Sequence, residues 1–451
     1  MKKVLILGAG HVANPLVRHL IQEGFYVKIA SKVFTEECEE LAATATNCET
    51  VSFEMNEETK LEELIQSCDL TVSLLPYAFH PKIASLCIRY KKDMVTASYV
   101  SEQMKALDED AREAGILILN EVGLDPGIDH MSAMKVIDEV HGLGGKVLEF
   151  KSYCGGLPAM QNNNNPFGYK FSWSPRGVVM AGRNNGQFLE NRRVVFIPAR
   201  DLFKNYCILD IEDIATFEAY TNRDALPYKE IYGLKEAHTV FRGTLRNVGW
   251  CYKMKKAQEL GLFDDSKRRD LKGLTYRRLM LKLIDKKESN DIIYDTANFL
   301  RLERYSTVMK RFQWLGLFEE NPLPPEDNVM DMFCALLQEK LAMAKDDLDL
   351  IVLHHRFVAM YPDRCEEITS TLEQTGTPGG DSAMAKCVGL PAAIASAMIL
   401  QGETSIKGVQ LPVKQEIYKP ILEKLQALNI HFKETTTPCP PPPQDSTCVL
   451  D

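Results

Sequence analysis

The stretch that decides the fold is VLILGAGHVA, residues 4–13. Its first four residues form a continuous apolar run of the kind that is buried in a parallel sheet. The run breaks into G-x-G-x-x-A, in which Gly8 allows a tight turn, Gly10 admits phosphates and Ala13 keeps the next helix close. We expect that helix over residues 14–23, with a pyrophosphate at its N-terminus. The alternative is an ordinary strand-turn-helix corner.

The second expected strand ends in KIASK, residues 28–32. An Asp or Glu about 20 residues after the glycines would bind the ribose hydroxyls of NAD and repel the 2′-phosphate of NADP. Ser31 and Lys32 can instead donate hydrogen bonds to a phosphate. We therefore expect NADP or NADPH as the cofactor; the alternative is that the two residues only open a solvated loop. The residues expected to bind the cofactor are Gly8, Gly10, His11, Val12, Ala13, Ser31, Lys32, Leu75 and Pro76.

The composition of the chain limits its partners. Its 451 residues suffice for two or three domains, and its net charge of −9 argues against nucleic acid. We find no apolar run that approaches the length needed to cross a bilayer, and the N-terminus enters a strand directly rather than a leader peptide. The twelve cysteines show no C-x-x-C pair and no zinc-like His spacing. We expect reduced thiols, no metal, no membrane partner and a cytoplasmic location.

Strands and helices alternate over the first 120 or so residues, as in a doubly wound α/β unit. Later segments predict a helix and a strand around the Gly-rich residues 142–145, a long helical region, a hairpin, a helix interrupted by Gly389-Leu390-Pro391, and a disordered Pro-rich tail. The expected strands are 70–75, 93–96, 116–120, 146–154, 349–360 and 365–372, and the expected helices are 57–67, 80–91, 101–113, 130–140 and 382–401.

Asp125 follows the sixth expected strand in the segment NEVGLDPGIDHM, residues 120–131. Ligands of open α/β sheets lie beyond the carboxyl ends of the strands, so Asp125 would project near the nicotinamide. A carboxylate there can exchange a proton with a reacting amine. The alternative is a helix cap, since Asp before Pro-Gly opens a helix well.

This segment, together with five others, resembles the saccharopine dehydrogenases of the glutamate-forming type. The resemblance runs from Lys3 to about Leu425 and implies NADPH-dependent reduction of the imine of L-glutamate and 2-aminoadipate 6-semialdehyde to saccharopine, in lysine biosynthesis by the aminoadipate route. The other segments are LLPYAFHP (74–81), VTASYVS (95–101), YCGGLPA (153–159), YKFSWSPRGV (169–178) and RGTLR (242–246).

The substrate chemistry calls for cations. Saccharopine carries three carboxylates, which arginine binds well, and Lys170 and Arg176 lie near the candidate arginines in sequence. The resemblance places Tyr99, Asp125 and Cys154 near the reacting carbon, although bound water or a substrate carboxylate could supply the proton. Each residue also has a structural alternative: Tyr99 as a ring packed over the sheet edge, Cys154 as a small buried strand residue, and the arginines as surface ion pairs. The expected substrate contacts are Ser98, Tyr99, Asp125, Arg223, Arg242, Gly243, Thr244, Leu245 and Arg246.

The resemblance also implies an architecture: a Rossmann-type doubly wound parallel sheet plus a mixed α/β substrate domain with an inserted helical domain. We expect a homodimer. Three alternatives stay open: an NAD-dependent enzyme of lysine degradation, an imine reductase acting on a polyamine, and a Rossmann protein that binds dinucleotide without chemistry. The expected divisions are 1–125 with 382–437 for the cofactor, 126–249 with 346–381 for the substrate and dimerisation, 250–345 for the helical insert, and 438–451 for the tail.

Overall fold

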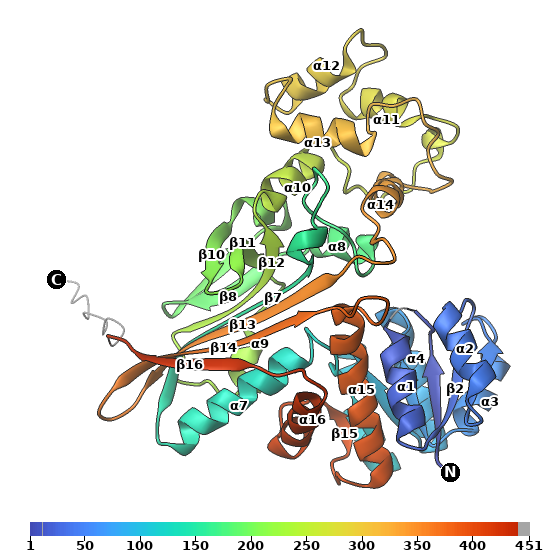
Figure 1. Cartoon of the computed structure of the whole chain (residues 1–451), viewed down its shortest axis with the longest axis vertical. Helices are drawn as coiled ribbons and strands as arrows, with labels where there is room; N and C mark the ends of the chain where they lie inside the picture. The colour runs from blue at the N-terminus through green and yellow to red at the C-terminus, as the bar shows by residue number, and fades with distance from the viewer. Residues whose placement is uncertain (11, 441–451) are drawn as a thin grey trace. The chain divides into compact units, whose positions relative to one another are not determined.

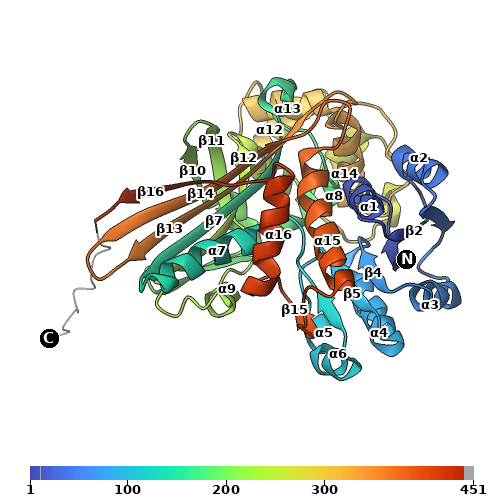
Figure 2. The same cartoon turned by 60° about the horizontal axis from the view of Figure 1, so that its bottom comes forward.

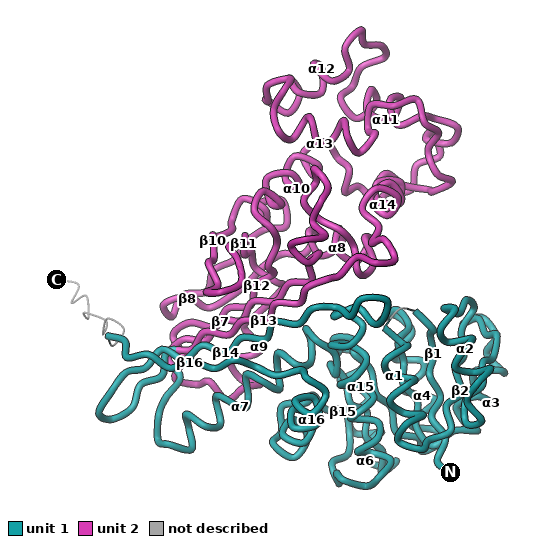
Figure 3. Tube along the Cα trace, viewed as in Figure 1, with its two compact units in different colours: residues 1–147, 358–451 teal, residues 148–357 magenta. Residues whose placement is uncertain are grey.

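The computed structural model describes residues 1–10 and 12–440 (Figure 1). Two compact units are present, one made of residues 1–147 and 358–451 and the other of residues 148–357 (Figure 3). The role expected for His11 and most of the expected tail lie outside the described residues. The finer division into cofactor, substrate and helical domains stays a prediction.

The first unit contains a sheet whose seven described strands are all parallel, in the order β15-β6-β5-β4-β1-β2-β3. The order reverses at β1, where a doubly wound sheet binds its ligand beyond the strand ends. The expected Rossmann-type sheet is confirmed. Its strands are β1 (Lys3–Leu7), β2 (Tyr26–Ser31), β3 (Cys48–Ser52), β4 (Leu70–Ser73), β5 (Asp93–Thr96), β6 (Leu117–Leu119) and β15 (Gly408–Gln410).

Helices accompany this sheet, and their apolar faces form its core with Leu5, Leu7 and Ile118. The single helix expected over residues 101–113 is wrong, because two helices occupy that stretch. The Asp108 carboxylate accepts the Val409 N–H at 2.7 Å, which fixes the start of the second one. The helices are α1 (Ala13–Gln22), α2 (Glu36–Thr44), α3 (Glu58–Gln66), η1 (Tyr77–Phe79), α4 (His80–Tyr90), α5 (Glu102–Lys105), α6 (Asp108–Ala114), α7 (Ile128–Gly142), α15 (Ala383–Gln401) and α16 (Gln415–Ala427).

Helix α15 corrects two expectations. It runs unbroken through Pro391, because close packing against α1 outweighs the helix-breaking tendency. A Cβ on Gly389 would lie 2.6 Å from the Val12 carbonyl oxygen, so only glycine lets the two helices approach this far. By length and composition α15 could also cross a membrane, contrary to our expectation; 78% of its apolar window is buried, which indicates a core helix. Figure 2 shows α15 between α1 and α16.

The second sheet is mixed, and its nine described strands include the path β10-β11-β12-β7-β13-β14-β16, with β8 beside β12 and β9 beside β8. Strand β12 runs parallel to β7 and antiparallel to β11. The expected hairpin is confirmed, with a turn closed by the Tyr361 N–H and the Arg364 carbonyl at 2.8 Å. The strands are β7 (Lys146–Pro158), β8 (Gly186–Glu190), β9 (Arg193–Ile197), β10 (Tyr206–Ile211), β11 (Ala215–Thr221), β12 (Thr239–Asn247), β13 (Asp349–Met360), β14 (Cys365–Thr375) and β16 (Lys433–Pro438).

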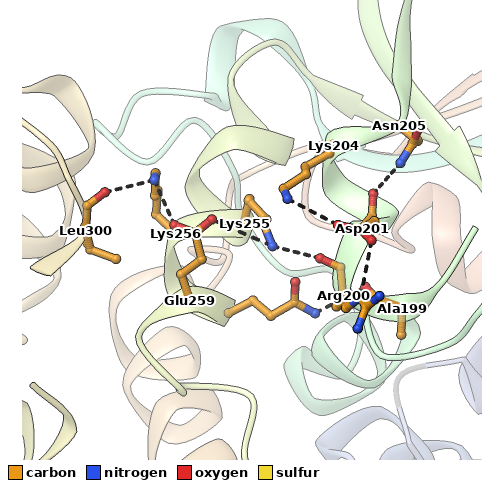
Figure 4. Close-up of polar contacts among 10 residues, drawn as sticks. Ala199, Arg200, Asp201, Lys204, Asn205, Lys255, Lys256, Glu259 and Leu300 are labelled. Carbon is orange, nitrogen blue, oxygen red and sulfur yellow. Dashed lines mark hydrogen bonds and ion pairs between the residues drawn. The ribbon is translucent and has the colours of Figure 1, made fainter.

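Helices follow β12 up to residue 340, as the periodicity predicts. Polar contacts attach the first of them, α10, to its neighbours: the Lys255 ammonium donates to the Arg200 carbonyl at 2.7 Å, and Lys256 donates to the Leu300 carbonyl at 3.0 Å (Figure 4). The helices of the second unit are η2 (Met160–Asn162), α8 (Pro175–Ala181), η3 (Ala199–Lys204), α9 (Pro227–Ile231), α10 (Trp250–Glu259), η4 (Arg269–Leu271), α11 (Tyr276–Leu283), α12 (Ile292–Phe299), α13 (Thr307–Leu315) and α14 (Val329–Lys340).

Candidate functional site

The glycine turn between β1 and α1 has the form that a dinucleotide requires. Gly8 has a φ of +102°, and a Cβ there would lie 3.4 Å from the carbonyl carbon of Leu74 and 3.5 Å from the Leu75 side chain. A Cβ on Gly10 would meet nothing within 4 Å, so this position faces open space. Helix α1 begins at the buried Ala13, and Val12 before it supplies no capping side chain. Its first N–H groups are therefore suited to a pyrophosphate.

Ser31 and Lys32 lie at the end of β2 and already have partners. The Ser31 hydroxyl donates to the Val33 carbonyl at 2.7 Å, and the Lys32 ammonium lies 3.1 Å from Glu54, with 71% of the lysine side chain exposed. Exposed ion pairs of this kind stabilise little, so both donors can turn to an anion. Glu54 was missed from sequence because the pairing of β2 with β3 was not predicted.

The structure brings Tyr99 and Asp125 together. Tyr99 follows β5 and Asp125 follows β6, and these neighbouring parallel strands end at the same sheet edge. The Tyr99 hydroxyl donates to the Asp125 carboxylate at 2.7 Å, and both side chains are half-buried. The carboxylate is therefore oriented by a phenol while part of it stays accessible. Among the other expected contacts at this edge, Leu75 is half-buried and Pro76 is exposed.

A buried carboxylate holds the two loops in register. The Glu121 side chain accepts the Val100 N–H at 2.9 Å with one oxygen and contacts His130 Nε2 at 2.7 Å with the other. Its own N–H donates to the Ser98 carbonyl at 3.2 Å, and its φ of +60° is rare for a residue with a side chain. Glu121 thus fixes the backbone on both sides of Tyr99 without occupying the expected substrate position itself.

His80 holds the side chain of Ser98. Its Nε2 lies 2.9 Å from the Ser98 hydroxyl and 3.2 Å from the Thr96 hydroxyl, and its Nδ1 lies 3.1 Å from the Ser73 hydroxyl. Burial lowers the pKa of His80 to about 4, so the ring is neutral near pH 7 and orients hydroxyls rather than charges. We missed both His80 and Glu121 from sequence; the only signal was a polar residue inside an otherwise apolar stretch.

Strand β12 carries the RGTLR segment in the second unit. Its parallel register with β7 pairs Thr244 with the buried Cys154, so these two expected residues are neighbours. A Cβ on Gly243 would lie 2.7 Å from the Phe241 ring, so a side chain at that position would clash. The Arg242 guanidinium is buried over the Tyr228 ring, 4.3 Å from its centroid, and Leu245 is fully buried. The segment is thus a packed strand with cationic groups inside the unit.

Arg246 differs from an ordinary buried arginine. Its guanidinium donates to the Leu245 carbonyl at 3.1 Å and to the Tyr220 hydroxyl, and it lies over the rings of Tyr169 and Trp250. Burial alone would lower the pKa of Arg246, but the surrounding tyrosines raise it, so the charge is retained. Among the described residues no carboxylate pairs with it, and its Nε and the indole N–H of Trp250 are buried without a partner.

The remaining expected cations lie in other surroundings. Arg223 is exposed at a positive φ of 56°, where its carbonyl accepts the Gln187 N–H. Lys170 forms a largely buried ion pair with Asp347 at 2.6 Å, and Arg176 forms a more exposed one with Asp331 at 2.8 Å. Lys170 and Arg176 are thus committed to structural pairs, whereas Arg246 has donors to offer an anion.

Comparison with known proteins places these features in one family. Residues 4–119 match the saccharopine dehydrogenase NADP binding domain, and residues 123–430 match the saccharopine dehydrogenase C-terminal domain. The chain belongs to the saccharopine dehydrogenase family. Saccharopine dehydrogenase [NADP(+), L-glutamate-forming] of Pyricularia oryzae is 38% identical to it over 435 residues, which are 94% of this chain and 96% of that one.

Two further proteins are similar to this chain over most of its length. The apo L-Glu-forming enzyme of Saccharomyces cerevisiae has a solved structure that superposes with a TM-score of 0.87 at 35% identity, covering 97% of this chain and 100% of that one. The mitochondrial alpha-aminoadipic semialdehyde synthase of Mus musculus is 38% identical over 97% of this chain. This chain spans about half of the mouse protein, 48% of its length.

Proposed function

We propose that this member of the family reduces the imine of L-glutamate and 2-aminoadipate 6-semialdehyde with NADPH to give saccharopine, and that the reaction is reversible. The observation that carries the proposal is Arg246, a buried cation with an unpartnered Nε and no carboxylate partner among the described residues. A substrate with three carboxylates can supply an anion to pair with such a cation. The names of the Pyricularia and Saccharomyces relatives agree with this substrate class.

The cofactor residues fit NADPH. Gly8 and Gly10 allow the backbone approach, and the uncapped start of α1 offers N–H groups to the pyrophosphate. Ser31 and Lys32 would bind the 2′-phosphate, with Lys32 exchanging Glu54 for the phosphate. When bound, NADPH supplies the hydride that reduces the imine carbon.

The chain itself supplies orientation and a proton. The Asp125 carboxylate, oriented by the Tyr99 hydroxyl at 2.7 Å, exchanges a proton with the substrate nitrogen as the imine becomes a secondary amine. Ser98, held by His80 in the first unit, is proposed to position the substrate. Cys154 and Thr244, which are neighbours in the second unit, are proposed as further substrate contacts. The remaining expected substrate contacts are Arg223, Arg242, Gly243 and Leu245.

We further propose a homodimer. Strands β9 and β10 each have one described strand neighbour, and they expose Val194, Phe196 and Ile208 by 59%, 53% and 58%. Apolar side chains gathered on sheet edges mark protein interfaces, and a second copy of the chain would cover them. Ile208→Lys is expected to yield a monomer in sedimentation velocity; an unchanged dimer would place the interface elsewhere, and a wild-type monomer would exclude it.

We also propose a cytoplasmic location. All eleven cysteines of the described residues lack a disulfide, and such usage suits a reducing compartment. Microscopy of the protein fused at its C-terminus to a fluorescent protein tests this. A diffuse cytoplasmic signal is expected, and a mitochondrial or secretory pattern would contradict it.

The reaction is tested by the reduction of NADP+ and of NAD+ by the purified chain in the presence of saccharopine, followed as absorbance of the reduced cofactor. We expect turnover with a clear preference for NADP+. A preference for NAD+ would contradict the role of Ser31 and Lys32 and favour a degradative enzyme. Absence of turnover with either cofactor, in protein that still binds NADP+, would refute the catalytic assignment.

A further inference from the structure

Two cysteines face each other where the C-terminal strand β16 joins β14. The antiparallel register pairs Glu366 with Pro438, and its next pair is Cys365 with Cys439. The Cys439 N–H donates to the Cys365 carbonyl at 3.0 Å, and the two sulfur atoms lie 2.9 Å apart. Cys365 is buried and Cys439 is half-exposed, so one thiol of the pair is open to solvent.

Exposed polar contacts help to hold the strand that carries Cys439. All six residues of β16 are exposed. Besides the backbone ladder, the Thr369 and Thr435 hydroxyls contact each other at 2.6 Å, and Glu434 accepts hydrogen bonds from Lys135 at 2.9 Å and from Ser370 at 3.3 Å. Exposed polar contacts of this kind contribute little, so a covalent link would change how firmly β16 is held.

We propose that Cys365 and Cys439 form a reversible disulfide that fastens β16 to β14. The oxidant is a low-molecular-weight disulfide of the glutathione class. The Cys439 thiolate attacks it and expels one small thiolate; Cys365, as a thiolate, then attacks the mixed disulfide at the Cys439 sulfur and expels the second. The two protein thiols lose two protons and two electrons, and the small disulfide becomes two thiols.

The geometry of the pair favours a disulfide that forms easily and is easily reduced. The two sulfurs are already in contact, so no strand has to move far to join them. The pair is a hydrogen-bonded cross-strand pair, whose Cβ atoms lie farther apart than those of a non-hydrogen-bonded pair. A disulfide there is slightly strained and has one half-exposed sulfur, which a small thiol can reach, and such bonds are readily reduced. The free thiols expected in a reducing compartment are thus compatible with a link that closes under oxidation.

The test is peptide mapping of the full chain after treatment with glutathione disulfide and without a reductant. Trypsin releases residues 365–386 and 434–451, and the second peptide also contains Cys448, so the experiment uses Cys448→Ser as background. We expect the two peptides to be joined, the link to vanish in Cys439→Ser and Cys439→Ala, and dithiothreitol to reverse it. Cys207→Ser, which removes an exposed cysteine on β10, serves as the matched control and keeps the link.

Amide hydrogen exchange of residues 433–438 measures how firmly β16 is held against β14. Oxidation is expected to slow exchange in this strand several-fold in the Cys448→Ser background and to leave it unchanged in Cys439→Ser. Recovery of Cys365 as a thiol with Cys439 carrying glutathione would overturn the proposal, as would a linked peptide without any change in exchange.

Discussion

The polar groups at the edge of the parallel sheet and those around β12 differ in how completely they are paired. Around Tyr99 and Asp125, neighbouring polar groups satisfy one another: Glu121 spans two loops, and His80 contacts three hydroxyls. Around Arg246, a cation lies among aromatic rings with its Nε unpartnered. The polar groups of the first region are already paired with one another, whereas we propose that an anion pairs with the cation of the second. We therefore expect substitutions in the first to change the chemical step and substitutions in the second to change binding.

The largest effect is expected for Arg246→Met, which removes the buried charge but fills its volume. Loss of a buried charge pair with a substrate carboxylate should lower kcat/KM for saccharopine by about 10²–10³-fold, mainly through KM. The free energy of unfolding should stay the same or rise, because methionine buries no desolvated charge at this position. Steady-state kinetics and denaturant unfolding measure both. Arg193→Met, at an exposed arginine of β9, should change neither; equal losses in the two variants would contradict the assignment.

Asp125→Asn should act on kcat instead. Removal of a proton-exchanging carboxylate costs on the order of 10²-fold or more, and the pH profile of kcat should lose the limb that the carboxylate supplies. Tyr99→Phe should cost about tenfold, since the carboxylate loses its orienting hydrogen bond. The matched control is Tyr418→Phe, which breaks a hydrogen bond of the same kind to Asp138 at 2.6 Å. A pH profile unchanged in Asp125→Asn would point to water or a substrate carboxylate as the proton source.

His80 should make stability depend on pH. Burial lowers the pKa of His80 from 6.5 to about 4, so between these values the unfolded chain binds a proton that the folded chain does not. The stabilisation is fully present above about pH 6.5 and falls as the pH drops toward 4, by on the order of 2–3 kcal/mol. Denaturant unfolding at about pH 7.5 and about pH 5 measures this slope.

Two variants isolate the contribution of His80. His80→Gln should reduce the difference between the two pH values and raise KM more than it lowers kcat, because Ser98 loses its support. His431→Gln, at an exposed histidine, should keep the wild-type difference. The same pH dependence in all three proteins would show that other groups cause it.

The smallest effect concerns cofactor choice. Lys32→Ala should raise KM for NADP+ about tenfold or less and leave KM for NAD+ unchanged, because only the 2′-phosphate loses its partner. Lys28→Ala is a close control: Lys28 pairs with Glu49 at 3.1 Å, the same distance as Lys32 to Glu54, but lies within β2 rather than at its end. Similar losses in the two variants would mean that Lys32 acts only through the general charge of the surface.

Local signals in the sequence predicted the first sheet well. The apolar run before Gly8 and the turn after it have one common structural solution, and the neighbouring ends of β5 and β6 made the meeting of Tyr99 with Asp125 foreseeable. Pro391 misled us, because a helix packed against α1 tolerates what an isolated helix does not. Glu54 and Glu121 were beyond reach, since their partners depend on which strands and loops become neighbours.

The second unit was harder to predict. Strands β9 and β10 expose much of their surface, so they lack the strict alternation that marks a half-buried strand. The sequence identifies RGTLR as a cationic segment. It does not predict that Arg246 lies among Tyr169, Tyr220 and Trp250 with an unpartnered Nε. That property depends on rings that are distant in sequence and meet only in the folded unit.

Arg246 is the group that we propose pairs with a substrate carboxylate. Isothermal titration of saccharopine into protein loaded with a non-reducible NADP+ analogue tests this pairing. No turnover can then complicate the measurement of affinity. We expect the affinity for saccharopine to fall about a hundredfold in Arg246→Met, to recover in part in Arg246→Lys, and to keep the wild-type value in Arg193→Met. The affinity for the cofactor should be equal in the wild type and the three variants. Equal saccharopine affinity in wild type and Arg246→Met would contradict the account.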